Sequence, residues 1–370
     1  MSESDVTRRG IRGERPGREA SPGALRGGGG ARQDGARRRG RGRRGEDLMV
    51  PRAEFDSYYG RPVIKAPAWQ ARDIAGYFFL GGLAGAGSVF AAGAQLTGRR
   101  TMATGLKVSS LVSVSLSAAA LVHDLGRPER FANMLRVFKP TSPMSVGSWL
   151  LGGYGPAAGA AALSAVTGRL PRTGATATAA AATLGPAVAA YTGVLAADTA
   201  VPAWHDAHRE LPYLFTASAT AAASGMALVL APTAQNGPAR CAAALAAGAE
   251  QALTRAMERR LGMVAETYRT GRAGTLMRCA GALTAAGAAT SVLFGGRSRS
   301  AAALGGLALL AGSACTRFGV FAAGMASAED PRYTVGPQRA RLGSARHETG
   351  HPSGAEGPTR HDTPKEEGQP

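Results

Sequence analysis

The middle of this chain contains long stretches with almost no charged residue. Between Ile74 and Ala323, runs rich in Ala, Leu, Gly and Val follow one another. Each run is about 18 to 23 residues long, enough to cross about 30 Å of hydrocarbon. The mean hydropathy of the whole chain is only -0.07 because both ends are polar. Since soluble folds seldom need such runs repeatedly, the sequence predicts an all-α, polytopic membrane protein.

Cysteine and histidine are scarce where cofactors would need them. The three cysteines, Cys241, Cys279 and Cys315, lie far apart and no CxxC pair is present, which argues against a disulfide framework or a cysteine-ligated iron–sulfur cluster. None of the six histidines lies in the middle of an apolar run, and no Gly-rich dinucleotide turn follows a strand. We therefore expect no haem, flavin, iron–sulfur cluster or other metal in this chain.

The chain has a net charge of +18 and begins with an Arg- and Gly-rich N-terminal stretch, whose first 47 residues contain thirteen arginines and seven acids. This stretch lacks the interleaved aromatic residues of a nucleic-acid module, so we interpret it as a disordered, solvated tail beside an anionic membrane surface. Its first 47 residues contain no apolar core of a secretory signal. Nucleic acid is therefore not the expected partner.

Hydropathy alone indicates seven or eight membrane-spanning helices. The first contains Gly81, Gly82, Gly85 and Gly87, which would let a neighbouring helix approach closely. The sixth is ambiguous because Glu250 lies within it and charged residues follow. The predicted spans are Ile74 to Leu96, Leu106 to Val122, Ser145 to Val166, Thr176 to Ala197, Leu211 to Leu230, Cys241 to Leu253, Ala273 to Phe294 and Ser300 to Ala323.

The loops after the second, fourth and sixth spans are long and would share one side of the membrane. They carry slightly more Lys and Arg than the short loops, and the Arg-rich tail lies on their side if the number of spans is even. Positive charge favours the cytoplasmic side. We therefore predict that both termini are cytoplasmic.

Polar residues gather on the face that carries the long loops. A site that reduces or oxidises a quinone needs hydrogen-bond donors for two ring carbonyls, a proton path and an apolar slot. Taken singly, these residues are also explained as helix caps, lipid-headgroup contacts or members of an interfacial aromatic belt. Glu250 stands apart, because a carboxylate in an apolar run is costly and often lies on a proton path. The residues of the polar face are Trp69, Asp73, His123, Asp124, Arg127, Tyr191, Asp198, Trp204, His205 and Asp206.

Several segments resemble the NrfD/polysulfide reductase membrane subunits. The resemblance covers about residues 58 to 339, and its most specific part is the DLGRP-to-Trp loop. The matching segments are LGGLAGAGS at Leu80 to Ser88, HDLGRPERFANMLRVFKPTSPMSVGSW at His123 to Trp149, YTGVL at Tyr191 to Leu195, LPYLFTASATAAASG at Leu211 to Gly225, RRLGMVAETYRTGRAG at Arg259 to Gly274 and RFGVFAAGMASAEDPRYTVGPQR at Arg317 to Arg339.

The resemblance implies eight transmembrane helices in two four-helix bundles at residues 58–339, between polar tails at 1–57 and 340–370. It also implies a menaquinone or ubiquinone site in the first bundle, where Tyr191 matches the family's tyrosine and Asp124 and Arg127 match its DLGRP loop. Implied partners are a ferredoxin-like iron–sulfur subunit and a molybdenum or tungsten catalytic subunit, for example one like formate dehydrogenase. Where family members carry Asn or His near the first helix, this chain has Trp69, Gln70, Arg72 and Asp73.

The sequence thus predicts a quinone-reacting membrane anchor of a multisubunit oxidoreductase. The candidate quinone-binding residues are Tyr191, Asp124, Arg127 and His123, and the candidate proton path comprises Asp73, Asp198, His205 and Glu250. A small-molecule or ion transporter is less favoured, because the mid-span positions read as uncharged and Pro186 has no counterpart in the second half. A structural anchor with a degenerate quinone site is the third alternative.

Overall fold

The computed structural model describes residues 6–7, 10–11, 64, 67, 69–124 and 133–336. Contacts divide the chain into two units, Met1–Arg61 and Pro62–Pro370. In the first unit, strands β1 (Val6–Thr7) and β2 (Gly10–Ile11) form an antiparallel pair. In the described part of the second unit, every regular element is a helix.

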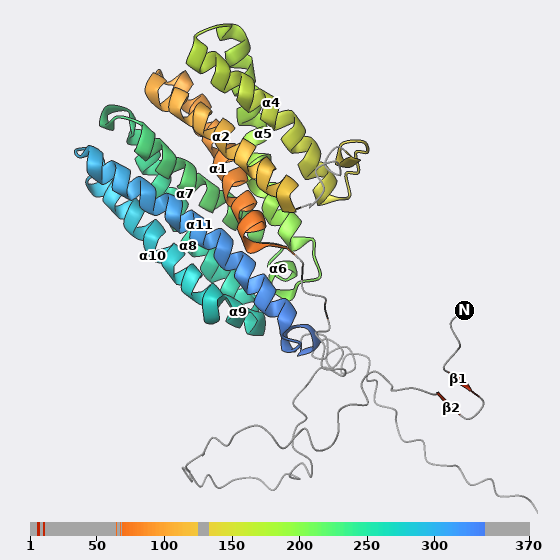
Figure 1. The fold of residues 1–370 in the computed structure, drawn as a ribbon. Coiled ribbons are helices and arrows are strands. Elements are labelled where there is room, and N and C mark those ends of the chain that lie inside the picture. Colours follow the sequence, from red (N-terminus) through yellow and green to blue (C-terminus); the bar gives the residue numbers. More distant parts are fainter. Residues whose placement is uncertain are drawn as a thin grey trace, which may run out of the picture. The chain divides into compact units, whose positions relative to one another are not determined.

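Each of the eight predicted spans coincides with a long helix of the second unit, and only the seventh extends past its helix, by one residue (Figure 1). Short elements connect them: α6, η2, η3 and α9. In chain order the helices are α1 (Ala71–Leu96), α2 (Arg100–Asp124), α4 (Pro143–Thr167), α5 (Pro171–Ala197), α6 (Pro202–His205), α7 (Leu211–Leu230), η2 (Thr233–Gln235), α8 (Gly237–Arg260), η3 (Gly262–Ala265), α9 (Glu266–Arg269), α10 (Gly271–Leu293) and α11 (Arg299–Glu329).

Six of these helices, α1, α2, α5, α7, α10 and α11, are long and apolar enough to cross a membrane. The two others are less apolar for different reasons. α8 contains Glu250 and a charged final turn, whereas α4 has no charge but contains five Gly, three Ser, one Trp and one Tyr. Many large apolar side chains on the helices are exposed, including Leu96, Leu163 and Leu307, as lipid-facing side chains are.

Local sequence signals set the helix ends. Proline occupies the first turn of α4, α5, α7 and α8, where its fixed φ and missing N–H fit the start of a helix. Gly168 closes α4 with a φ of 69°, a left-handed conformation that suits glycine. The short connections that follow α1 and α4 make successive helices antiparallel neighbours.

The helices pack side by side, with α4 and α5 on one flank and α8 and α10 on the other (Figure 1). α1 packs against α2, α5, α7 and α11, so it lies in the middle. Gly85 and Gly185 bring α1 and α5 together so closely that a Cβ on either would meet the other's backbone carbonyl. The predicted role of the first helix's glycines in close packing is thereby confirmed.

The last residues of α2, α5 and α8 lie at one end of the helices, which we call the long-loop end (Figure 1). Trp69, just before α1, stacks on Trp204 of α6 with ring centroids 5.6 Å apart. Arg260 at the end of α8 forms an ion pair with Glu210 before α7. Contacts between distant segments thus join the start of α1 to α6, and the end of α8 to the start of α7, at this end.

Candidate functional site

The start of α1 and the end of α2 are held together by polar contacts. His123 Nδ1 lies 2.9 Å from Asp73 Oδ2. The backbone N–H of Gln70 donates to Asp124 Oδ1 over 3.4 Å. Asp73 is largely buried, whereas the His123 side chain is 72% exposed. These contacts connect a partly buried carboxylate to a histidine in reach of water.

Tyr191 lies further inside the helix bundle than Asp73 and His123, in the last two turns of α5. Its hydroxyl forms a hydrogen bond with the hydroxyl of Tyr77 on α1, and the two rings meet edge to face at 75°. The Tyr191 ring covers Gly147 of α4, where a Cβ would lie 2.5 Å from Tyr191 Cε2. Three helices therefore fix the position of this phenol.

A cavity of about 90 Å³ opens beside the tyrosine pair. Tyr191 and Asp124, both predicted from the sequence, line this cavity together with Tyr77, which sequence reasoning missed. Its remaining wall is mostly apolar, with two flexible methionine side chains. The lining residues are Trp69, Ile74, Tyr77, Phe78, Leu121, Asp124, Met134, Met144, Ser148, Tyr191 and Leu195.

Among the described residues, the other predicted site residues do not line this cavity. His123 faces Asp73 instead, and Arg127 lies outside the described residues. Asp198 is exposed at the end of α5, and exposed His205 lies 3.3 Å from the Ala197 carbonyl oxygen. The cavity thus brings two of the predicted residues together.

Trp204 differs from an interfacial belt residue. It is only 1% exposed, and its Nε1 donates to the Val320 carbonyl oxygen over 2.7 Å. Its ring also packs on Phe321 of α11 and on Trp69. The interpretation of Trp204 as an aromatic anchor at the lipid interface is therefore wrong, because α11 covers a side chain that looks interfacial from the sequence alone.

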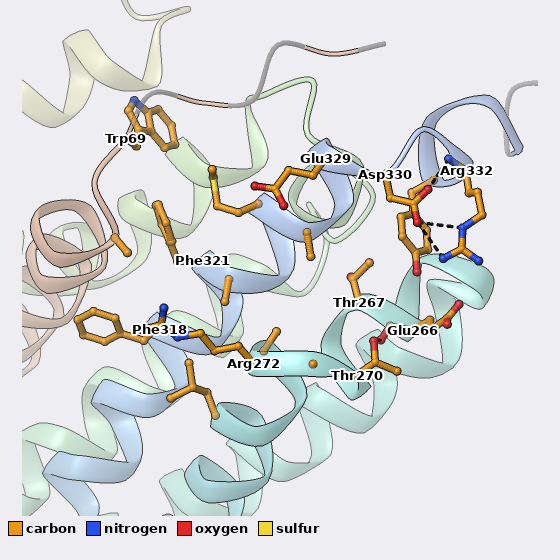
Figure 2. Close-up of a pocket in the computed structure, with 18 residues that line it drawn as sticks. Trp69, Glu266, Thr267, Thr270, Arg272, Phe318, Phe321, Glu329, Asp330 and Arg332 are labelled. Carbon is orange, nitrogen blue, oxygen red and sulfur yellow. Dashed lines mark hydrogen bonds and ion pairs between the residues drawn. The ribbon is translucent and has the colours of Figure 1, made fainter. Parts of the chain in front are cut away.

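A larger cavity of about 630 Å³ lies between α9, α10 and the end of α11 (Figure 2). Its floor includes Phe318 and Phe321, and its rim is charged. Figure 2 shows Asp330 and Arg332 joined at this rim, with Asp330 Oδ2 2.8 Å from the guanidinium. The hydrogen bond from Arg332 lowers the pKa of Asp330 below its usual value. Trp69 lines both cavities.

Two ionisable residues are buried inside the second half of the chain. Glu250 of α8 is 3% exposed, as its position in an apolar run suggested. Arg317 of α11 is 0% exposed, and this residue was missed. The inference that mid-span positions are uncharged is therefore wrong, since Arg317 lies well inside α11.

Metal-ligating side chains do not gather anywhere in the described residues: no group of three or more His, Cys, Asp or Glu is placed to hold a metal ion. Cys241, Cys279 and Cys315 are free thiols.

Apolar helices with exposed aliphatic side chains, and polar groups collected at helix ends, define a multi-pass membrane protein. Residues 67–240 match the family model described as Polysulphide reductase, NrfD. The resemblance seen in the sequence is thereby confirmed over that segment, which runs from the start of α1 into α8. No curated protein matches the chain. The family match indicates a membrane subunit of a polysulfide reductase-like oxidoreductase.

Proposed function

We propose that this chain is the quinone-reacting membrane subunit of a multisubunit oxidoreductase. It would pass electrons between an iron–sulfur partner subunit and the membrane quinone pool. The observation that carries the proposal is the cavity at the long-loop end, where Tyr191, Tyr77 and Asp124 converge inside an apolar wall. The segment that matches the family model contains all three residues.

The chemistry of the lining fits a quinone headgroup. A quinone takes up two electrons and two protons when it is reduced, and its two carbonyl oxygens accept hydrogen bonds. The Tyr191 and Tyr77 hydroxyls can donate such bonds, and burial makes each bond worth forming. Ile74, Phe78 and the other apolar lining residues exclude water from the headgroup.

A headgroup needs more room than the cavity offers with the tyrosines paired. Ligand pockets usually measure roughly 300 to 1,000 Å³, against about 90 Å³ here. Met134 and Met144 line the cavity, and unbranched methionine side chains repack easily. We infer that quinone binding displaces these methionines and exchanges the Tyr77–Tyr191 hydrogen bond for bonds to the ligand.

Protons would reach the cavity from the water side. Asp124 lies between the cavity and the helix end, next to His123 and its partner Asp73. We propose that Asp124 delivers protons to the quinone and that Asp73 and His123 connect it to water. Arg127 remains a predicted contributor from the sequence. Asp198 and His205 lie exposed on neighbouring segments, where they would mark the surface near the entry.

The partner subunits would bind at the long-loop end, because electrons must arrive close to the cavity. We propose a ferredoxin-like iron–sulfur subunit there, joined to a molybdenum or tungsten catalytic subunit such as a formate dehydrogenase-like enzyme. The exchangeable quinone would be menaquinone or ubiquinone. The chain itself would hold no haem, flavin or iron–sulfur cluster.

The complete architecture that we propose has eight membrane-spanning helices in two four-helix bundles, with α4 and α8 crossing the membrane beside the six more apolar helices. The transmembrane domain would cover residues 58–339, and both polar tails would lie in the cytoplasm. Alkaline-phosphatase activity in a C-terminal fusion, with no signal from a fused cytoplasmic fluorescent reporter, would reverse this orientation.

The test of the quinone site is Tyr191→Phe, which removes only the hydroxyl. In the purified complex, quinone reduction driven by an artificial donor should fall about tenfold, the effect of a lost hydrogen bond of about 1.4 kcal/mol. The matched control is Tyr154→Phe. Tyr154 is also buried in the first half, but its hydroxyl contacts Ser88 and the Ala84 carbonyl oxygen and does not line the cavity.

Asp124→Asn should have the larger effect, roughly a hundredfold, because it removes a group that can transfer protons. Co-purification of the iron–sulfur subunit must stay normal, which separates lost chemistry from lost docking. Unchanged quinone turnover in Tyr191→Phe and Asp124→Asn, with the complex intact, would refute the assignment. Asp124 would then be a helix-end contact, and the chain a structural anchor.

A transporter is the second candidate, and the buried charges Glu250 and Arg317 are the observation that favours it. A transporter would move a solute across proteoliposomes without an electron donor. Electron transfer to quinone that requires the partner subunits would instead support the main proposal.

A further inference from the structure

Glu250 is a carboxylate enclosed by helices on all sides. It lies near the middle of α8, and Thr316 of α11 donates a hydrogen bond to its Oε1 over 2.5 Å. Its other oxygen, Oε2, is buried and has no hydrogen-bond partner among the described residues. Buried polar atoms in proteins nearly always have partners. One half of this carboxylate is therefore available to a small polar species.

Arg317, the next residue along α11, is the buried cation of the same region. Its Nη2 donates to the Phe215 carbonyl oxygen over 2.6 Å, and its guanidinium lies 3.9 Å from the centroid of the Phe215 ring. Nε and Nη1 have no partner among the described residues. Gly82 of α1 leaves room for this side chain, since a Cβ there would lie 3.1 Å from Nη2.

No direct ion pair joins Glu250 to Arg317 within the described residues. The two residues nevertheless share one region, because Thr316, which bonds to Glu250, immediately precedes Arg317. From α7, Ser218 adds a hydroxyl that is bonded to Ser313 of α11 over 2.9 Å. The cationic residues of α10, the other helix that packs on α8, lie in its first eight residues: Arg272 and Arg278.

Removing a carboxylate and a guanidinium from water is expensive unless other groups satisfy both. Within the described residues, the oxygen without a partner belongs to Glu250 and the nitrogens without a partner belong to Arg317, so the region offers both an acceptor and donors. A water molecule, which makes two to four polar contacts, suits such a site. An inorganic anion is disfavoured by the carboxylate, and a metal cation by the guanidinium. Water and protons are the species that such a mixed site accepts.

We propose that Glu250 is a proton-exchanging group inside the second half of the chain, with Arg317 as its counter-charge. A proton would bind at Oε2 and leave from it again, and the neighbouring buried hydroxyls of Thr316, Ser218 and Ser313 would be the first groups on its route. This site is independent of the proposed quinone site: both residues lie beyond the segment 67–240 that matches the family model, and neither lines the cavity.

The test is infrared difference spectroscopy of the full chain in lipid, recorded between acidic and alkaline pH in water and in heavy water. A proton-exchanging Glu250 gives a carboxylic-acid carbonyl signal that follows pH. Glu250→Gln should abolish this signal. Glu258→Gln is the matched control, because Glu258 lies on the same helix but pairs with Arg269 at its outer end.

Thr316→Val gives a second measurement in a chain that keeps the carboxyl group. Losing the hydrogen bond to Oε1 should shift the frequency of the same signal, and Arg317→Lys should shift the pH at which it appears. A pH-dependent signal that is identical in the unaltered chain, Glu250→Gln and Thr316→Val would overturn the proposal. So would the absence of any such signal in the unaltered chain, which would leave Glu250 and Arg317 with a structural role.

Discussion

Polar groups lie at different depths in the two halves of the molecule. In the first half, α1 to α5, the charged residues Asp73, His123 and Asp124 lie at helix ends, and hydroxyls occupy the deeper layer. In the second half, α7 to α11, a carboxylate and a guanidinium are enclosed between helices. Charges at a helix end keep contact with water, whereas charges in the interior depend on one another.

The backbone packing of the halves is similar despite this chemical difference. Gly85 and Gly185 let α1 approach α5, and Gly225 and Gly306 do the same for α7 and α11. Small residues allow such contacts in both places. The contrast between the halves therefore comes from a few polar side chains rather than from different architectures. Each prediction below changes one of these side chains or its neighbour.

The largest effect is expected from Arg317→Met, which leaves Glu250 buried without its counter-charge. The free energy of unfolding in detergent should fall by about 3 to 5 kcal/mol, the usual cost of leaving a buried charge uncompensated. Adding Glu250→Gln to the same chain should restore most of the loss, because neither charge then remains. Arg332→Met, at the exposed rim of the larger cavity, is the control. Equal losses of unfolding free energy in Arg317→Met and Arg332→Met would show that the depth of a charge does not determine its effect on stability.

Gly147→Ala should have an intermediate effect on the first half. The new Cβ would lie 2.5 Å from Tyr191 Cε2, so the tyrosine must move away from Tyr77. We expect a stability loss of about 1 to 3 kcal/mol, together with slower quinone reduction by the complex. Gly155→Ala, also on α4, has nothing within 4 Å of its new Cβ and should change neither property. If Gly147→Ala left quinone turnover unchanged, the position of Tyr191 would not matter for activity.

The smallest effect is expected at the Asp330–Arg332 pair near the end of α11. Because the pKa of Asp330 is lowered in the folded chain, the pair stabilises above the unfolded pKa of about 3.9. The stabilisation is lost as pH falls through the lower folded pKa. Solvent screening at this exposed rim keeps the effect small. The protection factors of the backbone amides at the end of α11, which correct for the intrinsic pH dependence of exchange, should fall in acid, and Arg332→Gln should remove this fall.

Helix positions were largely predictable because they depend on local properties. Each of the eight predicted spans coincides with a helix, since apolar runs of sufficient length and prolines in first turns act within one segment. Glu250 was recognised as unusual for the same reason: a carboxylate in an apolar run is visible in one dimension. Tyr191 and Asp124 were picked from the polar residues at helix ends, and one cavity contains both.

Pairings between distant residues were decided by the tertiary structure. Tyr77 is separated from Tyr191 by 114 positions, and nothing around it in the sequence marks it as a partner. Arg317 was overlooked because the 30 other residues of α11 are typical of an ordinary membrane-spanning helix. Its contacts, in contrast, come from α7 and α1. From the sequence, Trp204 was also explained as an interfacial residue, but in the structure α11 covers its side chain. Hydropathy reports how a segment partitions between water and lipid, but the burial and charge balance of one side chain depend on which other helices surround it.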